Sequence, residues 1–362
     1  MTDAIQYPFA TPPTEFAAIE VAPGIQWLRL PLPLALDHVN CYALQDADGW
    51  TLVDTGISSK RTKAIWHALL ALPLQGKPVH RLIVTHHHPD HIGLAGWFQA
   101  QGVELLTTRT AWLYARMLTL DEQRLPSPES LTFYQRAGLD QARQAEKATE
   151  RPFNFRDVVS PMPLGFTRIN EGSIITAGGR DWRVRLGQGH APDHATLWSM
   201  DDNLIIGGDQ FLPTISPNIG VYPTEPGADP LSEWLATSRA FMPHARPDHL
   251  VLPGHKLPFT GLPYRLAQMV ENHETALQRL QAHLTVPRTA VDCFPVLFRR
   301  EIGPTDFGLA LAEAVANLNC LLQRGVVSRW LGHDGAWHWQ AGGGDGQGDD
   351  KTKSEISGAV GL

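Results

Sequence analysis

The segment THHHPDHIG, residues 85–93, is the part of the sequence that says most about the fold. It follows the apolar residues Leu82–Val84, which predict a short buried strand. Four of its nine positions are histidine and one is aspartate. Because side chains two positions apart point the same way in extended backbone, we expect His86 and His88 to converge on one point while His87 faces elsewhere.

Pro89 interrupts this extended run. The chain is expected to turn there, so that Asp90 and His91 approach from the opposite side. The spacing H-x-H-x-D-H therefore predicts two groups of ligands that face two adjacent points. Imidazole and carboxylate are ligand types that suit zinc, iron or manganese.

Three later stretches have a similar character, because in each of them an apolar strand leads to one potential ligand. These are GQGHAPDHATLW (187–198) with His190, LIIGGDQ (204–210) with Asp209, and LVLPGHK (250–256) with His255. Strand ends that meet at one edge of a sheet are common places for sites in α/β proteins. We therefore expect these three side chains to join the histidine cluster.

Alternating strand and helix patterns over most of the chain predict an α/β layered domain. The expected strands are 25–30, 39–45, 50–54, 82–84, 103–106, 173–175, 182–186, 196–199, 204–206 and 249–252. The expected helices in this region are 61–72, 93–101, 110–120, 128–150 and 230–241. Residues 107–165 break the alternation, and we interpret them as a helical insertion that lies over one face.

The ordered motifs THHHPDH, GHAPDH, GGD and PGH, with LVDTG (52–56) upstream, resemble those of the metallo-β-lactamase superfamily over about residues 25–260. The resemblance implies a four-layer αβ/βα sandwich with a dinuclear metal centre at its edge. Position by position, it implies His86, His88 and His190 as ligands of the first ion, Asp90, His91 and His255 as ligands of the second, and Asp209 between both. It also implies that Asp54 and His194 orient the ligands without binding a metal themselves.

The chain of 362 residues is expected to comprise three parts. Residues 1–262 would form the metallo-β-lactamase-like catalytic domain, which includes the insertion. Residues 263–340 would form a small winged-helix-like domain, built from helices 264–283 and 307–323 and a hairpin at 326–340. Residues 341–362 are rich in glycine and polar residues and are expected to be disordered.

Several single residues receive a plainer interpretation. We expect His87 to be a loop or pocket-wall residue and not to bind a metal. His244, His273 and His333 are expected at the surface. Cys41 lies within a strand pattern and is expected to be a buried structural thiol.

The expected cofactors are two divalent ions, with zinc first and iron or manganese as alternatives. Two ions about 3.5–4 Å apart can share a water and lower its pKa to near 7, which makes a bridging hydroxide available as the nucleophile. Asp90 is expected to serve both as a ligand and as a catalytic proton shuttle. The resulting hypothesis is a metal-dependent hydrolase of a small thioester or ester. The β-lactamase branches resemble this set less well, because they lack an aspartate at the position of Asp209.

Three alternatives stay open on the sequence. The carboxy-terminal part is similar to that of a group of hydroxyacylglutathione-hydrolase-like proteins, which includes lactamase-B2-like endoribonucleases that cleave single-stranded RNA. Against RNA, residues 263–340 contain seven arginines, no lysine and seven acidic residues, whereas a phosphate-binding module should have a basic excess. A lactonase would share every ligand, and a persulfide dioxygenase would use the same motifs for a single iron.

Composition sets the remaining expectations. Hydrophobic residues make up 43% of the chain and charged residues 19%, and the net charge is −7, which argues against nucleic acid as a partner. Only three cysteines occur, without C-x-x-C spacing, and no export signal or membrane-spanning run is evident, so a cytoplasmic protein with no membrane association is expected. Aromatic residues in the insertion favour a small-molecule substrate, and the carboxy-terminal part is expected to serve packing or formation of a homodimer.

Overall fold

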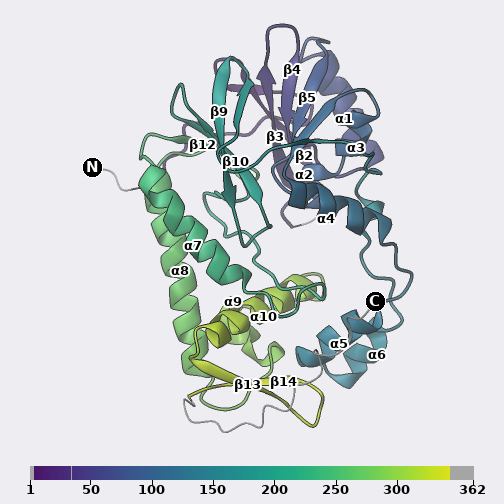
Figure 1. Ribbon diagram of the computed structural model, residues 1–362, viewed down its shortest axis with the longest axis vertical. Coiled ribbons are helices and arrows are strands. Elements are labelled where there is room, and N and C mark those ends of the chain that lie inside the picture. Colours follow the sequence, from purple (N-terminus) through teal and green to yellow (C-terminus); the bar gives the residue numbers. More distant parts are fainter. Residues whose placement is uncertain (1–3, 34, 343–362) are drawn as a thin grey trace, which may run out of the picture.

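The computed structural model describes residues 4–33 and 35–342, and two β-sheets dominate its upper part (Figure 1). The first sheet has seven strands in sequence order: β1 (Ile19–Ala22), β2 (Ile25–Pro31), β3 (His38–Gln45), β4 (Trp50–Val53), β5 (Val79–Ile83), β6 (Glu104–Thr107) and β7 (Thr167–Arg168). The strands from β1 to β4 pair antiparallel, and those from β4 to β7 pair parallel. The histidine segment follows directly after the end of β5, in the parallel half of this sheet.

The second sheet has five strands in the order β12-β11-β10-β9-β8. Its strands are β8 (Ile174–Ala177), β9 (Arg180–Gly187), β10 (His194–Ser199), β11 (Leu204–Gly208) and β12 (Leu250–Pro253). Strands β8 to β11 pair antiparallel, whereas β11 and β12 pair parallel. The parallel pair therefore ends at one edge of the sheet, where Asp209 and His255 follow.

Apolar side chains on both faces of each sheet produce a layered core. Trp27 of β2 packs between the sheets together with Trp182 of β9, whereas its neighbour Leu28 packs on the outer side of the first sheet. Likewise Leu197 of β10 faces the first sheet and Trp198 faces outward. Successive side chains of a strand point to opposite faces, so each sheet contributes to two apolar layers. With helices on both outer faces, the expected four-layer αβ/βα sandwich is confirmed.

Helices α1 (Lys60–Ala71) and α3 (Ala95–Gln99) cover the outer face of the first sheet. The amino terminus of α1 is capped by the Ser59 Oγ, which accepts a hydrogen bond from the Thr62 backbone N–H at 2.9 Å. The short helix α2 (Pro89–Ile92) begins at the proline of the histidine segment. Proline fits the first position of a helix because the missing N–H has no partner there in any case.

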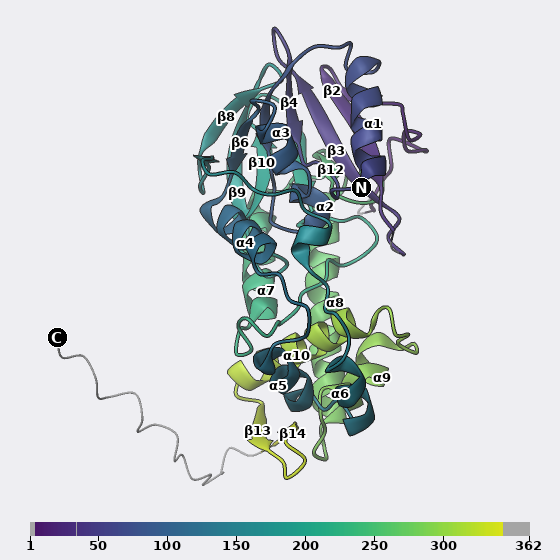
Figure 2. The same ribbon diagram turned by 90° about the vertical axis from the view of Figure 1, so that its right-hand side faces the viewer.

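The insertion does not form a single cover over the sandwich. Helix α4 (Arg109–Leu120) and the 3₁₀ turn η1 (Phe155–Asp157) lie against the sandwich, whereas α5 (Pro128–Arg136) and α6 (Gln141–Lys147) lie at the opposite end of the molecule (Figure 2). The expectation of one helix over 128–150 is wrong. Gly138 adopts a φ of +93°, which ends α5, and a Cβ there would come within 2.3 Å of Thr289.

The carboxy-terminal part consists of helices and a hairpin. Its elements are α8 (Leu262–His283), η3 (Val291–Cys293), α9 (Phe294–Phe298), α10 (Phe307–Gln323), β13 (Val327–Leu331) and β14 (Trp337–Ala341). They pack below the sandwich together with α7 (Pro230–Phe241) and η2 (Met242–His244). The helices and hairpin expected from the sequence are present, whereas the winged-helix likeness and the division of the chain at residue 262 stay predictions.

The tail expected at 341–362 lies outside the described residues from 343 onward, and Ala341 still belongs to β14. Strands β1 and β7 were not predicted from the sequence. None of the helices in residues 4–33 and 35–342 combines the length and the apolar character that crossing a bilayer requires.

Candidate metal centre

The candidate site lies where loops from both sheets meet. The chain leaves β5 at residue 84 and continues through the histidine segment, while the second sheet contributes the β9–β10 loop and the ends of β11 and β12. The Ala195 backbone N–H donates to the Thr85 carbonyl at 2.8 Å, and the Asn40 N–H of β3 donates to the Gly254 carbonyl at 2.7 Å. These backbone bonds hold the loops of the two sheets in fixed relation to one another.

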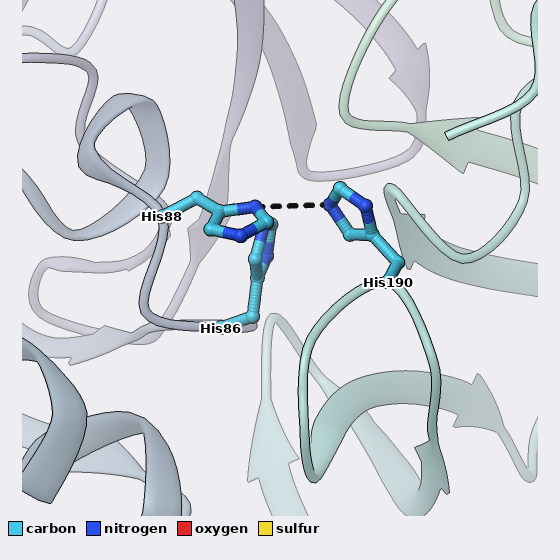
Figure 3. Close-up of side chains that lie close together, drawn as sticks. All are labelled: His86, His88 and His190. Carbon is cyan, nitrogen blue, oxygen red and sulfur yellow. Dashed lines mark hydrogen bonds between the residues drawn. The ribbon is translucent and has the colours of Figure 1, made fainter. Parts of the chain in front are cut away.

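The first group of potential ligands consists of three histidines. His86 and His88 extend from the segment after β5, and His190 approaches from the facing β9–β10 loop (Figure 3). The His88 Nδ1 lies 3.0 Å from the His86 Nε2 and 3.0 Å from the His190 Nε2. Three ring nitrogens thus face one point, as the alternation of side chains along an extended segment predicted for His86 and His88.

The second group consists of Asp90, His91 and His255. The Asp90 Oδ2 lies 3.5 Å from the His91 Nε2 and 3.3 Å from the His255 Nε2. The turn at Pro89 places Asp90 and His91 on the first turn of α2, beside the loop that carries His255.

Asp209 lies between the two groups. Its Oδ2 is 3.4 Å from the His190 Nε2 and 3.1 Å from the His255 Nε2, so that one oxygen approaches a member of each group. Its Oδ1 is 3.4 Å from the His91 Nε2. All seven side chains that the sequence suggested as ligands are therefore brought together.

Hydrogen bonds to the other ring nitrogen fix the tautomers of three histidines. The Nδ1–H groups donate to acceptors that have no proton of their own to give: His91 to the Asp54 Oδ2, His190 to the Asn218 carbonyl and His255 to the His38 carbonyl, each at 2.7 Å. In the neutral form of each ring, the Nε2 has a lone pair that faces the centre. This is the arrangement in which an outer partner orients a metal-binding imidazole.

Asp54 lies beneath the centre, at the end of β4. Its Oδ1 accepts a hydrogen bond from the Thr85 N–H at 2.9 Å and its Oδ2 accepts one from the Thr85 Oγ1 at 2.9 Å, in addition to the bond from His91. Its backbone has a φ of 61°, a left-handed conformation that aspartate tolerates better than most residues. Its position agrees with the orienting role that the resemblance implies.

His194 and His87 lie beside the groups of potential ligands and belong to neither. The His194 Nε2 accepts a hydrogen bond from the Asp209 N–H at 3.1 Å, and its ring stacks on that of His86 with centroids 4.5 Å apart. The His87 ring points away and packs against Tyr114 of α4, with ring centroids 5.0 Å apart. His87 therefore lies outside the groups of potential ligands, as predicted.

The electrostatic surroundings favour neutral imidazoles in the first group of potential ligands and a positive charge in the second group. Burial lowers the pKa of His86 and of His88 well below the usual range, and the neighbouring rings lower it further. Burial also opposes protonation of His91, but the carboxylates around it, Asp209 foremost, outweigh burial and raise its pKa well above the usual value. For Asp209, burial raises the pKa, yet His255 and His91 bring it well below the usual value. A cation between the carboxylates would satisfy these opposing demands.

Three observations show that the residues present fit a metal. The His91 Nε2 and the Asp209 Oδ1 are buried without a hydrogen-bond partner among the described residues. A Cβ on Gly254 would lie 2.2 Å from the Asp209 Oδ1, so a side chain there would fill the space between the ligands. The donors are imidazole nitrogens and carboxylate oxygens, which suit divalent transition metals.

Some residues of the site could not be recognised in the sequence. Asn218 and His38 act through their backbone carbonyls, and every residue type has such a carbonyl. Asn218 lies in the irregular loop that follows Asp209, and its carbonyl brings this loop into contact with His190. Thr85 lies next to the histidines and is adjacent to Asp54 only because β4 and β5 pair in parallel.

Comparisons with known proteins agree with this geometry. The family described as the metallo-beta-lactamase superfamily matches residues 34–255, and the family described as the metallo-beta-lactamase-like C-terminal domain matches residues 277–342. The first of these matches covers more than half of the chain and includes all seven potential ligands.

Individual relatives extend over nearly the whole chain. A curated relative, the probable metallo-hydrolase YqjP of Bacillus subtilis (strain 168), is 25% identical over 323 residues, which cover 84% of this chain and 95% of that protein. The crystal structure of a beta-lactamase domain protein from Burkholderia ambifaria is 36% identical, has a TM-score of 0.86 and covers 93% of this chain and 98% of that one. A metallo-beta-lactamase family protein from Thermus thermophilus is 25% identical with a TM-score of 0.73, covering 89% of this chain and 100% of that one.

The fold, the arrangement of the seven side chains and the extent of these matches agree with one another. The chain therefore belongs to the metallo-β-lactamase superfamily.

Proposed function

We propose that this protein is a hydrolase that depends on two divalent metal ions. The observation that carries the proposal is the position of the Asp209 Oδ2, which lies within 3.4 Å of an imidazole nitrogen from each of the two histidine-containing groups. A carboxylate shared in this way suits a pair of ions better than a single one. The name of the Bacillus relative, a probable metallo-hydrolase, supports the reaction class.

His86, His88 and His190 would hold one ion, and Asp90, His91 and His255 the other, with Asp209 in contact with both. Zinc is the metal that we propose first, because the donors are histidine nitrogens and carboxylate oxygens; iron and manganese accept the same donors. When bound, two such ions supply Lewis acidity and lower the pKa of a coordinated water to near neutral.

Asp90 is the residue of this chain that we assign to proton transfer. Its side chain is 21% exposed, compared with 8% for Asp209 and 2% for His255, so it lies at the open side of the centre. The Oδ2 is near the His91 and His255 rings, which leaves the other oxygen available to accept a proton and to return it to a leaving group. The bonds to Asp54, Asn218 and His38 keep the histidines oriented during this step.

A small thioester or ester is the substrate that we propose. The wall next to His88 is built from the rings of His87, Tyr114 and Phe155, which favour an apolar acyl group. Cys41, Cys293 and Cys320 are all buried and unpaired, which supports a reducing, cytoplasmic setting.

Metal analysis and a substrate panel test the proposal. Purified protein supplied with zinc is expected to bind two ions per chain and to hydrolyse an acyl thioester or ester. His86→Ala and Asp209→Ala should lower the metal content and reduce kcat/KM at least about a hundredfold, because each removes a ligand. The exposed His244 provides the matched control, and His244→Ala should change neither quantity. Unchanged turnover in both ligand variants would contradict the proposal.

The same panel separates the alternatives. Lactones and single-stranded RNA are tested beside the thioesters, and salt-sensitive RNA cleavage that is lost in Asp90→Ala would favour the endoribonuclease. A content of one iron, with oxygen uptake in the presence of a persulfide, would favour the dioxygenase. Preferential turnover of lactones would favour the lactonase.

A further inference from the structure

A cavity lies away from the potential metal ligands, between the insertion and the carboxy-terminal hairpin. It has a volume of about 440 Å³ and is lined by helix α5, by the segment that contains Pro223 and Pro226, and by strands β13 and β14. Cavities of a few hundred cubic ångströms hold small organic ligands. The two parts of the chain that enclose it are more than 180 residues apart in sequence.

Two arginines and two tryptophans define the chemistry of this cavity. The guanidinium of Arg136 lies 4.9 Å from the centre of the Trp337 ring, and that of Arg329 lies 4.4 Å from the same centre. Arg329 is also 5.9 Å from the centre of the Trp339 ring. Cation–π contacts of this kind hold the arginine side chains in place but leave their charges uncompensated.

The two positive charges have no acidic partner in the described part of the chain. Within residues 4–33 and 35–342, no carboxylate lies within ion-pairing distance of Arg136 or Arg329, and neither guanidinium donates a hydrogen bond. Burial lowers the pKa of Arg329, and repulsion from the positive charge of Arg136 lowers it further. Holding two like charges together in a partly buried place is unfavourable unless an anion accompanies them.

The other lining groups fit a ligand with a flat apolar body. Trp339 is 1% exposed and its Nε1–H has no hydrogen-bond partner among the described residues. Phe133 and the two prolines add apolar surface. Glu129, the one acidic residue of the lining, is exposed in the first turn of α5 and pairs with neither arginine. The cavity therefore has a basic, aromatic interior and an acidic residue on its rim.

We propose that this cavity binds a small organic anion, whose carboxylate or phosphate group lies at Arg136 and Arg329 and whose flat apolar part packs against Trp337, Pro223 and Pro226. Arginine is suited to this because its planar guanidinium can donate two parallel hydrogen bonds to such a group. The proposal does not depend on the metal centre or on the reaction that occurs there.

The cavity is also linked to the candidate metal centre through one loop. Residues 209–229 begin at Asp209, pass Asn218, whose carbonyl accepts from His190, and reach the cavity at Pro223 and Pro226. An anion in the cavity would therefore contact the same loop that orients a proposed metal ligand. This makes the site suited to a small molecule that adjusts activity from a distance.

Calorimetric titration of the metal-loaded protein tests the site. The probes are 1-naphthoate, its neutral analogue 1-naphthamide, and inorganic phosphate as an anion without a ring. We expect 1-naphthoate to bind at least tenfold more tightly than either of the others. Arg136→Gln and Arg329→Gln should each weaken 1-naphthoate binding about tenfold and leave 1-naphthamide binding unchanged, since each removes one charge-assisted interaction.

Arg143 provides the matched control. It belongs to the same insertion and lies over the Phe307 ring at 5.1 Å, but it has Asp140 as an ion-pair partner. Arg143→Gln removes the same charge and should leave all three affinities unchanged. Where a glutamine variant melts at a lower temperature than the wild type, Arg136→Lys keeps the charge and should retain most of the preference for 1-naphthoate over 1-naphthamide.

Two further variants identify the place of binding. Naphthoate affinity that survives both arginine substitutions and disappears in Asp209→Ala would place the anion at the metals and overturn the proposal. If 1-naphthoate binds only to a chain that ends at residue 342, the acidic residues of 343–362 compete with it for the cavity in the full chain. That result would also overturn the proposal. Equal affinities for 1-naphthoate and 1-naphthamide would do the same.

Discussion

Asp54 shows how much one residue contributes to the candidate centre. Its two oxygens accept hydrogen bonds from Thr85 and His91, and it is almost fully buried. A buried carboxylate that accepts several hydrogen bonds is held in a single orientation. Asp54 therefore fixes both the start of the histidine segment and the ring of His91.

The first prediction concerns Asp54→Asn. Asparagine keeps the size and tolerates the left-handed backbone, but its amide replaces one accepting oxygen with a donor. The His91 Nδ1–H would lose its anionic partner, and metal affinity should fall about 10–100-fold while the fold is retained. Competition with a chelator of known affinity measures this change. Asp48→Asn, at an exposed position, is the control, and equal chelator resistance in the two variants would contradict the role of Asp54.

The sequence was most informative at the scale of single side chains. Histidine and aspartate have few reasons to gather in a nine-residue segment, so four of the seven potential ligands stood out there, and the other three were identified from strand ends and from the resemblance to the superfamily. The roles of Asn218 and His38 could not be identified from the sequence, because they act through backbone carbonyls, which every residue type has. The unpaired arginines of the cavity were also missed, because Arg136 and Arg329 come together only in the folded chain.

Among the helices, α7 and α10 were predicted at their observed bounds and the α5–α6 region was not. Pro230 at the start of α7 and a regular apolar stripe leave little ambiguity. In 128–150 the helical pattern continued across Gly138, where contact with Thr289 and a left-handed backbone end the helix. That contact joins residues far apart in sequence, so local periodicity could not show it.

His273 of α8 was expected at the surface, and that prediction is wrong. Its side chain is buried between α7 and α8, with its ring centroid 4.9 Å from that of Trp234. Burial lowers its pKa to about 4, while Glu274 raises it and Arg265 lowers it slightly further. From the sequence alone, a histidine on a long helix is expected to face solvent, because the sequence does not show which helix packs against it.

The second prediction follows from this burial. Folded His273 stays neutral down to about pH 4, whereas in the unfolded chain it takes up a proton near its ordinary pKa of 6.5. Between these values the unfolded state binds more protons, so the free energy of unfolding should decrease as the pH falls from 6.5 to 4. His273→Gln should remove this contribution, on the order of 2 kcal/mol at pH 4.5. Denaturant unfolding at pH 7 and pH 4.5 measures it, with the exposed His244→Gln as control; equal pH dependence of both variants would contradict it.

At the scale of the whole molecule, one apolar cluster joins the sandwich to the carboxy-terminal part. It runs from Trp198 and Val251 of the second sheet through Trp234 of α7 to Leu277 of α8 and Trp339 of β14. Clusters shared in this way make two parts of a chain fold as one unit. The carboxy-terminal part therefore supports the outer layer of the second sheet, although it matches a family of its own.

The third prediction concerns truncation. A chain that ends at residue 261 lacks α8, α10 and the hairpin, and would expose the apolar faces of α7 and the second sheet to water. We expect it to lose cooperative thermal unfolding and to aggregate, whereas a chain that ends at residue 342 should melt at the temperature of the full-length protein. Solubility and melting curves of the two chains check this. Cooperative melting of the shorter chain at an unchanged temperature would contradict a shared core.

The origin of the ligands in two sheets has a consequence for biosynthesis. The first group is complete only once residue 190 has been added, and the second only once residue 255 has been added, although four of the seven side chains are translated by residue 91. A nascent chain on the ribosome therefore carries an unfinished cluster of histidines from residue 91 to residue 255, which is nearly half of its elongation. Neither group of potential ligands is complete until synthesis has passed the midpoint of the polypeptide.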